Sequence, residues 1–208
     1  MTDKMILRTT LTSPFGRKVR MAAEVLGLAT RIKIVPANTR DETDTLRHQN
    51  PLGKIPCLLL PDGTAFFDSR VIIEFLDMLE GQPSLVPASG IDRFRVLTRA
   101  TLFDGVTDAA LLLVYERRFR KEKQVSEPWL DHQRGKVFRG LKAAASELPD
   151  PTRTDITSIG LACALGYLDW RRPVEWRERF SIIAEWLEAF SANEPAYAAT
   201  ECPTENAA

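Results

Sequence analysis

The sequence of 208 residues predicts two domains, an α/β domain over residues 1–80 and an all-helical domain over residues 92–208. Two observations predict this division. Strand-like and helix-like runs of apolar residues alternate in the first part of the chain, whereas only the helical period is found after residue 92. Between the two parts, residues 81–91 are rich in proline, glycine and serine, which is typical of a linker.

The first domain is predicted to have the element order βαβ, a connecting segment, then ββα. The expected strands cover residues 5–10, 31–35, 56–60 and 65–67, and the expected helices cover residues 14–28 and 70–79. Gly27 is placed to end the first of these helices. The sequence Pro61-Asp62-Gly63 is a strong turn signal, so we expect the last two strands to pair as a hairpin.

The second domain is predicted to consist of four helices, at residues 93–123, 129–148, 156–170 and 176–190. A break in the first of these helices is expected near Gly105. Thr152 and Asp155 form a T-x-x-D pattern, which is typical of the capping arrangement at the start of a helix, here the third one.

Composition and charge limit the classes of function. Lys and Arg number 28 and Asp and Glu number 28, so the chain lacks the basic excess with which proteins neutralise nucleic-acid phosphates. No apolar stretch approaches the roughly 18 residues that a membrane-spanning helix needs. The three cysteines, Cys57, Cys163 and Cys202, are widely spaced, which indicates a reducing compartment and neither a disulfide framework nor a zinc site. We therefore expect a cytoplasmic protein without a metal ion and without nucleic acid or membrane as a partner.

The first motif that can carry chemistry is T-S-P-F at residues 12–15, between the first strand and the first helix. Serine is favoured as a helix cap and proline at the first helical position, so the Ser13 hydroxyl is expected at a helix N-terminus, which favours an anion. Two interpretations stay open: Ser13 caps its own helix, or its hydroxyl faces an anionic ligand. Arg17, Lys18 and Arg20 follow closely and are expected to be solvated surface charges that raise the local positive potential.

Two further motifs offer groups for a peptide-like ligand. The segment N-P-L-G-K-I-P at residues 50–56 precedes the third strand, and a cis Ile55–Pro56 bond would leave the backbone of Ile55 able to pair with a ligand. Asp68 and Ser69 precede the last helix of the domain. Ser69 is expected to cap this helix, or else to bind a carboxylate while Asp68 accepts a hydrogen bond from an adjacent ammonium. An amino-acid head group carries this pair of charges.

Taken together, these motifs and their order resemble the cytosolic glutathione transferase superfamily, over essentially the whole chain from Leu7 to the region of Pro195. The resemblance is to bacterial members with an S-P-F motif and a D-G-x-x-D-A segment, here residues 104–109. It implies a thioredoxin-like first domain, a helical second domain, a cis peptide bond before Pro56, glutathione as co-substrate and a role in detoxification.

The resemblance also implies roles for individual residues. Ser13 would face the glutathione sulfur, and Phe15 would pack beside it. Ile55 would pair its backbone with the cysteinyl part of the tripeptide, and Lys54 would lie alongside.

At the other end of the ligand, Asp68 and Ser69 would hold the γ-glutamyl ammonium and carboxylate. Asp104 would reach the glutathione of a neighbouring subunit, because the family usually forms homodimers. The apolar cluster at residues 109–114 gives some support for such an interface, although burial within its own domain explains the cluster equally well.

The implied reaction is conjugation of the glutathione thiolate to small hydrophobic electrophiles, with Ser13 stabilising the thiolate. The N-terminal tyrosine used by some classes is absent, and Ser13 occupies the place of the cysteine found in thiol-transferring classes. The alternatives are a glutathione-dependent reductase, isomerase or dehalogenase, and a non-catalytic glutathione-binding module of the same fold. Cys57 is expected to point into the sheet, so it is a poor substitute for a thiol at position 13.

Overall fold

The structure is a computed structural model that describes residues 4–79, 81 and 85–203. The chain divides into two compact units, the second of which spans Ser89–Pro195. The first unit contains the residues up to Ala88 and those from Ala196 onward. The C-terminal segment therefore groups with the first unit, whereas the sequence placed it in the helical domain. Residues 82–84 of the predicted linker lie outside the described residues.

A four-stranded sheet with the strand order β2-β1-β3-β4 forms the basis of the first unit. Its strands are β1 (Met5–Thr9), β2 (Ile32–Pro36), β3 (Cys57–Leu59) and β4 (Ala65–Phe66). β1 lies parallel to β2 and antiparallel to β3, and β3 pairs antiparallel with β4. The predicted hairpin of the last two strands is thereby confirmed.

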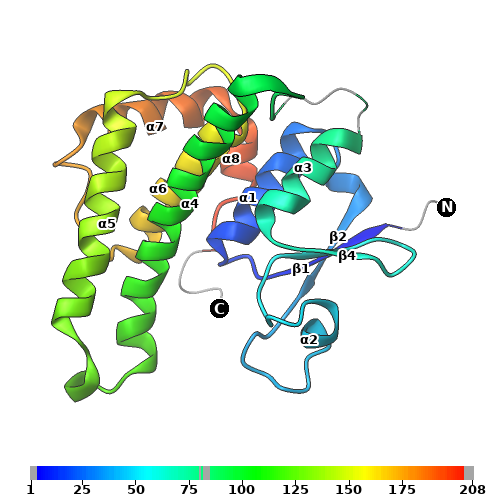
Figure 1. The fold of residues 1–208 in the computed structure, drawn as a ribbon, viewed down its shortest axis with the longest axis horizontal. Coiled ribbons are helices and arrows are strands. Elements are labelled where there is room, and N and C mark those ends of the chain that lie inside the picture. Colours follow the sequence, from blue (N-terminus) through cyan, green and yellow to red (C-terminus); the bar gives the residue numbers. More distant parts are fainter. Residues whose placement is uncertain (1–3, 80, 82–84, 204–208) are drawn as a thin grey trace. The chain divides into compact units, whose positions relative to one another are not determined.

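Helices cover both faces of this sheet (Figure 1). They are α1 (Pro14–Val25), α2 (Leu46–Gln49) and α3 (Ser69–Leu79), with a 3₁₀ turn at Ala29–Arg31. α1 and α3 lie on one face and α2 on the other. Successive side chains of a strand point to opposite faces, so the buried Thr9 faces α1 while the buried Arg8 faces α2. The predicted βαβ–ββα fold class is confirmed.

α1 begins at Pro14, as predicted, and ends at Val25, three residues before the predicted end. Ser13 is the N-cap, Pro14 occupies the first helical position, and Gly27 has a φ of 67°. The N–H of Leu28 donates to the carbonyl of Ala23 at 2.8 Å, which closes the last turn in the manner of a Schellman motif. A glycine is needed here because other residues are strained in the left-handed conformation.

The second unit consists of helices α4 (Gly90–Phe119), α5 (Glu127–Ser146), α6 (Ile156–Arg171) and α7 (Ser181–Asn193), with a 3₁₀ turn at Glu122–Gln124. α6 is the central helix, because every side chain from Ile156 to Leu168 is buried. The break expected near Gly105 is wrong, since α4 continues through it. A glycine inside a helix costs only about 1 kcal/mol relative to alanine, which packing of α4 against α5 and α6 offsets.

The capping arrangement predicted at the start of α6 is shifted by three residues along the chain. Asp155 is the N-cap: its carboxylate accepts the N–H of Ser158 at 3.1 Å, and the Ser158 hydroxyl accepts the N–H of Asp155 at 2.9 Å. Thr152 instead donates to Asp150 at 2.7 Å in the preceding turn. Asp155 directly precedes the helix, so its carboxylate reaches the unpaired N–H groups of the first turn.

The last predicted helix begins five residues later than expected. The Trp176 indole donates to Asp169 at 2.9 Å, and the N–H of Phe180 closes a turn on Trp176, so α7 starts only at Ser181. The short helices α2 and α8 (Pro195–Ala199) were not predicted, because four or five residues are too few to show a helical period. Among the described residues, no helix is long and apolar enough to cross a membrane.

Candidate functional site

The first two predicted motifs lie at the same end of the sheet. β1 leads through Ser13 directly into α1. β3 runs antiparallel to β1 with Cys57 opposite Arg8, so the residues just before β3, including Ile55, lie beside the chain that leaves β1. The N-terminus of α1 and the backbone of Ile55 are therefore neighbours at one edge of the first unit.

The third motif reaches this end of the sheet through the hairpin. Phe66 of β4 pairs with Leu58 of β3, so the chain leaving β4 runs back toward the start of β3. It then passes through Asp68 into α3, whose N-terminus lies at the same end of the sheet. The topology thus brings together all three motifs that the sequence singled out within the first unit.

Ser13 is a helix cap whose hydroxyl has one further hydrogen bond to give. Its Oγ accepts the N–H of Gly16 at 3.1 Å, and the residue is 9% exposed. A hydroxyl has two acceptor lone pairs and one donor, so capping uses a lone pair and leaves the proton able to point at an anion. The capping interpretation is therefore observed, and it is compatible with the ligand-facing one.

A glycine lets α1 begin close to the sheet. A Cβ at Gly16 would collide with the side chain of Thr9, which is itself fully buried at the end of β1. Substitution at Gly16 would push the first turn of α1 away from the strand. The position of the Ser13 hydroxyl therefore depends on this close approach.

Asn50 shapes the loop that carries Lys54 and Ile55. Its side chain is 1% exposed, donates to the carbonyl of Lys54 at 2.8 Å and accepts the N–H of Leu52 at 3.1 Å. Lys54 is exposed, Ile55 is half-buried, and the Ile55–Pro56 bond is cis, as the resemblance implied. One buried amide thus closes the turn immediately before the backbone proposed to face a ligand.

At the start of α3 the capping residue is Asp68, and the expectation that Ser69 caps this helix is wrong. The Asp68 carboxylate accepts the N–H of Arg70 at 3.0 Å, and its carbonyl accepts the N–H of Ile72 at 3.0 Å. Ser69 is already the first helical residue and is 2% exposed. The residue before the first helical one is placed to reach the free N–H groups, which explains the difference.

Asp68 is the more accessible member of this pair, and it is held in its charged form. Its side chain is 53% exposed and forms an ion pair with Arg70 at 2.7 Å. Partial burial alone would raise the pKa of Asp68, but the hydrogen bonds from Arg70 and the positive charges of Arg70 and Lys18 outweigh it, so the pKa lies below its ordinary value. A carboxylate at this edge can therefore attract a cationic group at neutral pH.

The remaining predicted residues lie as follows. Phe15 is half-buried in the first turn of α1. Cys57 is fully buried, and burial raises the pKa of its thiol, so it is a poor source of thiolate. Asp104 is 6% exposed and belongs to α4 of the second unit. Within the described part of the chain, no group of three or more His, Cys, Asp or Glu side chains is arranged to hold a metal ion.

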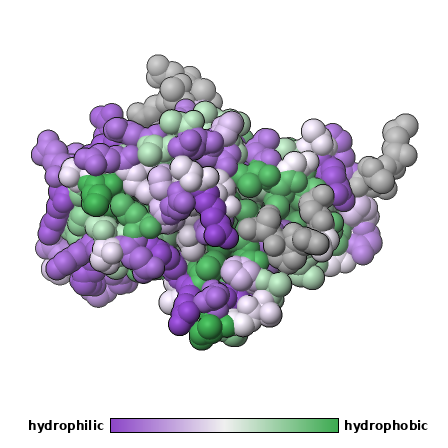
Figure 2. Space-filling view, turned by 90° about the horizontal axis from the view of Figure 1, so that it is seen from above, coloured by the Kyte–Doolittle hydropathy of each residue, from purple (hydrophilic) through white to green (hydrophobic). Residues whose placement is uncertain are grey.

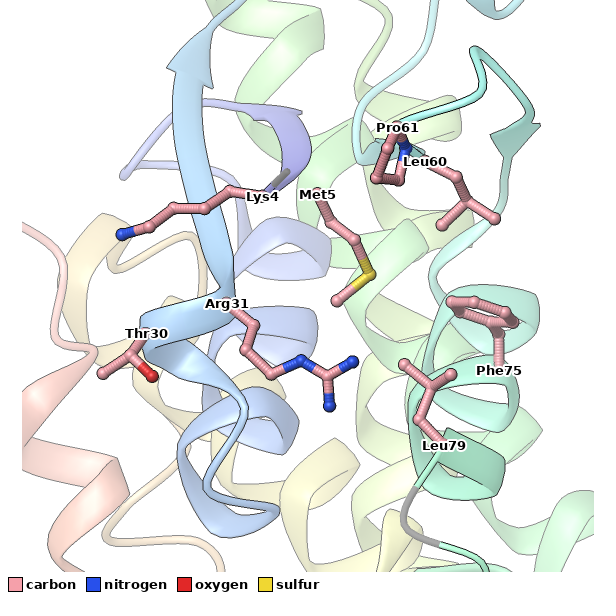
Figure 3. Close-up of a pocket in the computed structure, with 8 residues that line it drawn as sticks. All are labelled: Lys4, Met5, Thr30, Arg31, Leu60, Pro61, Phe75 and Leu79. Atoms are coloured by element: carbon pink, nitrogen blue, oxygen red, sulfur yellow. The ribbon is translucent and has the colours of Figure 1, made fainter. Parts of the chain in front are cut away.

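A cavity of about 610 Å³ lies at the opposite end of the sheet, near the start of β1 and the end of α3. Its lining residues are Lys4, Met5, Thr30, Arg31, Leu60, Pro61, Phe75 and Leu79. In Figure 3 the Arg31 side chain extends into the space between Met5 and Leu79. None of the predicted site residues lines this cavity, so it is separate from the candidate site.

Comparisons with known proteins identify the family. The model of the glutathione S-transferase N-terminal domain matches residues 12–79, which include all three motifs. An uncharacterised GST-like protein of Escherichia coli K12, YibF, is 36% identical over 166 residues, covering 77% of this chain and 80% of that protein. The chain belongs to the glutathione S-transferase family.

Solved structures of glutathione transferases have the same fold as this chain. A family member from Pseudomonas fluorescens Pf-5 with bound glutathione has a TM-score of 0.89 and 38% identity, covering 97% of this chain and 100% of that one. A glutathione S-transferase from Methylobacillus flagellatus KT with glutathione bound has a TM-score of 0.87 and 31% identity, covering 96% and 100%. The thioredoxin-like first domain and the helical second domain are thereby confirmed.

The expectation that Arg17, Lys18 and Arg20 of this family member are solvated is wrong, since all three are at most 9% exposed. Arg17 donates to the carbonyl of Tyr197 at 2.9 Å and lies over the Tyr197 ring at 4.3 Å, while Arg20 donates to the carbonyl of Thr200 at 2.8 Å. Cations near the N-terminus of a helix interact unfavourably with the helix dipole. This unfavourable placement is the sequence signal that such side chains have specific partners elsewhere.

Proposed function

We propose that this chain is an enzyme that conjugates the thiolate of glutathione to small hydrophobic electrophiles. The observation that carries the proposal is the Ser13 hydroxyl at the N-terminus of α1, at the same end of the sheet as Ile55 and Asp68. The relatives with bound glutathione support glutathione as the co-substrate.

Each part of glutathione has a group of matching chemistry at this edge. The γ-glutamyl ammonium would pair with Asp68, whose two oxygens offer enough lone pairs to serve both this ammonium and Arg70. The γ-glutamyl carboxylate would lie at the N-terminus of α3, beside Ser69, where N–H groups and the helix dipole favour an anion. The backbone of Ile55 would pair with the cysteinyl amide, and Lys54 would lie beside the ligand.

The reaction requires a thiolate at neutral pH. A free thiol has a pKa of about 8.5, so only a few per cent of it is ionised. A hydrogen bond from Ser13 and the dipole of α1 would lower the pKa of the bound thiol, and each unit of lowering corresponds to about 1.4 kcal/mol. The sulfur then forms a bond to the electrophilic carbon; in an aryl halide the carbon–halogen bond breaks and the halide leaves with the bonding pair. The thiol proton passes to solvent, so no general base on the protein is needed.

The test combines binding and turnover on the wild-type protein. We expect retention on immobilised glutathione, elution by free glutathione and conjugation of a reactive aryl chloride. Retention without conjugation of this or other electrophiles would instead select the non-catalytic binding module. Failure to bind glutathione by calorimetry would overturn the proposal. A disulfide reductase is disfavoured because position 13 lacks a thiol and Cys57 is buried.

We further propose a cytoplasmic homodimer. Support comes from exposed apolar side chains of each unit; Figure 2 shows apolar side chains among the polar ones at the surface. Val71 and Met78 of α3 are 47% and 71% exposed, and Ile91 and Phe94 of α4 are 64% exposed each. Apolar surface of this kind is typical of interfaces. Asp104 remains a candidate for a contact with the partner's glutathione.

A further inference from the structure

Arg8 on β1 is a buried cation that joins the sheet to the segment leading to the candidate site. The side chains of Arg8 and of its ion-pair partner Asp44 are 8% and 12% exposed, and their charged atoms are 2.7 Å apart. Arg8 points to the face of the sheet opposite α1. It therefore has no direct access to a ligand at the Ser13 edge and can act on it only through other residues.

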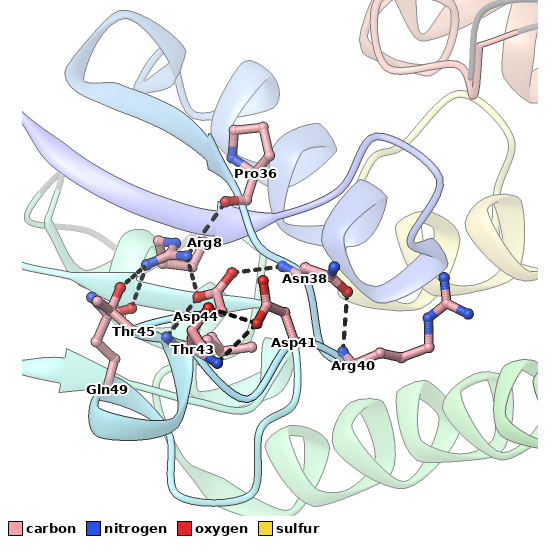
Figure 4. A network of polar contacts seen from close by, with 10 residues as sticks. Arg8, Pro36, Asn38, Arg40, Asp41, Thr43, Asp44, Thr45 and Gln49 are labelled. Atoms are coloured by element: carbon pink, nitrogen blue, oxygen red, sulfur yellow. Dashed lines mark hydrogen bonds and ion pairs between the residues drawn. The ribbon is translucent and has the colours of Figure 1, made fainter.

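The guanidinium of Arg8 contacts both ends of the short helix α2 (Figure 4). It donates to Thr45 at 2.9 Å, Gln49 at 2.9 Å, Asp44 at 2.7 Å and the carbonyl of Pro36 at 3.4 Å. Arginine presents five donors in a planar fork, so one side chain can serve several convergent acceptors, which a lysine ammonium cannot do in the same geometry. Arg8 thus fixes α2 relative to the sheet at several points.

The network continues from α2 to the backbone of Ile55. Asp44 also accepts the N–H of Leu46 at 2.7 Å, which fixes the start of α2. The N–H of Asn50 donates to the carbonyl of Leu46 at 2.7 Å, and the Asn50 side chain donates to the carbonyl of Lys54 at 2.8 Å. Hydrogen bonds therefore connect Arg8 to the peptide group immediately before Ile55.

Apolar packing also holds α2 on the sheet, but it constrains α2 in a different way from the hydrogen bonds of Arg8. Leu46 is 1% exposed and belongs to a cluster with Ala37 and Cys57, against which Ile55 packs. Burial of apolar surface is non-directional, so it keeps α2 in place without fixing its rotation. The hydrogen bonds of Arg8 are directional and fix that rotation.

We infer that Arg8 is a positioning residue that sets the place of the Ile55 backbone, and thereby the affinity for glutathione, without touching the ligand. The inference rests on the proposed function. Loss of the Arg8 fork leaves α2 attached through Leu46 but free to rotate, so the Ile55 N–H and C=O no longer match the ligand amide. The thiolate step at Ser13 is expected to remain intact, because α1 lies on the other face of the sheet.

The experiment compares Arg8→Lys with Arg99→Lys. Arg99 is a partly buried arginine of the second unit, paired with Glu147 at 2.8 Å, so it controls for the loss of an arginine as such. We expect Arg8→Lys to raise the calorimetric Kd and the KM for glutathione about tenfold, as the loss of one or two net hydrogen bonds would. We expect kcat at saturating glutathione to stay within about twofold, and amide exchange over residues 46–50 to accelerate. Arg99→Lys should change none of these.

A folded Arg8→Lys protein with the wild-type Kd would overturn the inference, as would a fall in kcat at unchanged Kd, which indicates fewer active molecules. If Arg8→Lys does not fold, the milder Gln49→Ala decides the matter, because it removes one link of the fork to α2. A raised Kd in Gln49→Ala supports the inference, and an unchanged Kd contradicts it. Absence of glutathione binding by the wild-type protein overturns the proposed function instead, while amide exchange still tests the link from Arg8 to α2.

Discussion

Ser13 serves two functions with one hydroxyl, and the two can be separated by experiment. Its oxygen caps α1 by accepting the N–H of Gly16, and its proton is proposed to stabilise the glutathione thiolate. Removal of the hydroxyl therefore affects both stability and turnover. A helix cap contributes about 1 kcal/mol to stability, whereas a donor aimed at a developing or full anion contributes more.

For Ser13→Ala we expect turnover to fall about ten- to a thousandfold, which corresponds to about 1.4–4 kcal/mol of lost anion stabilisation. Binding of glutathione should change much less, because the other contacts of the tripeptide are kept. The measurements are the kcat for aryl chloride conjugation and the calorimetric Kd for glutathione.

The matched control for Ser13→Ala is Ser126→Ala. Ser126 is the N-cap of α5 and accepts the N–H of Trp129, so its loss removes a serine cap without touching the candidate site. It should lower the unfolding temperature and leave turnover unchanged. Full activity in Ser13→Ala together with loss of activity in Thr12→Ala would assign the sulfur contact to Thr12.

For Asp68→Ala we expect a higher half-saturating concentration of glutathione, because a charge-assisted hydrogen bond to the ammonium is lost. The pH dependence has a definite sign. The pKa of Asp68 lies below its ordinary value, so the carboxylate keeps its charge to a lower pH than an ordinary aspartate does. Its contribution to binding should be constant from neutral to mildly acidic pH and disappear only as the pH falls through the lowered pKa.

Calorimetric titrations with glutathione from pH 8 down to pH 3 measure both effects. Asp92→Ala is the control, because Asp92 is an exposed carboxylate that pairs with Arg95 at 2.9 Å on α4. It should leave the Kd unchanged. An Asp68→Ala protein that binds glutathione as tightly as the wild type would remove Asp68 from the site.

At the scale of the elements, the residue at which a helix begins is determined largely by its capping residues. The capping box of α6 joins Asp155 and Ser158 at the start of a helix whose first thirteen residues are all buried. The Asp155 carboxylate accepts the N–H groups of Thr157 and Ser158, and both residues are buried, so its loss leaves N–H groups unsatisfied in the interior.

For Asp155→Ala we expect a loss of about 1–3 kcal/mol in the free energy of unfolding, the upper part of the range expected for a lost cap, because a buried partner is also stranded. Urea unfolding followed by circular dichroism measures it. Asp150→Ala, in the exposed turn that Asp150 forms with Thr152, should cost far less. Equal losses in the two variants would contradict the assigned capping role.

Elements with a strong period or a strong stop signal were predicted well. α1 and α3 were expected within a few residues of their observed ends, and Gly27 does end α1. α2 and α8 were missed because they are too short to show a helical period, and the late start of α7 was missed because it depends on side-chain contacts such as the hydrogen bond from Trp176 to Asp169.

At the scale of the whole molecule, the proposed homodimer is directly testable. Light scattering of a dilute solution should give about twice the chain mass of 23.4 kDa. The reason is that association would bury the exposed apolar side chains of α3 and α4, which favours the dimer. Met78→Glu and Phe94→Glu should shift the mass toward that of a monomer, and Leu52→Glu, at an exposed loop position, provides the comparison. A fully active monomer at nanomolar concentration would defeat both the dimer and a cross-subunit role for Asp104.

The sequence by itself determined the fold class, an α/β part followed by a helical part, and the three motifs of the candidate site. Those features depend on local signals: the period of apolar residues, the turn residues at 61–63, and the serine and proline at the start of α1. The order of the elements then brings the motifs to one end of the sheet.

Only the tertiary structure decided which polar groups are buried. Arg8 and Arg17 look like ordinary surface residues in the sequence, yet each is at most 7% exposed. A charged or amide side chain can be buried only where acceptors or donors from distant segments converge on it, as the partners of Arg8 from β2 and α2 do. Such convergence is a property of the folded chain and leaves no periodic signal in the sequence.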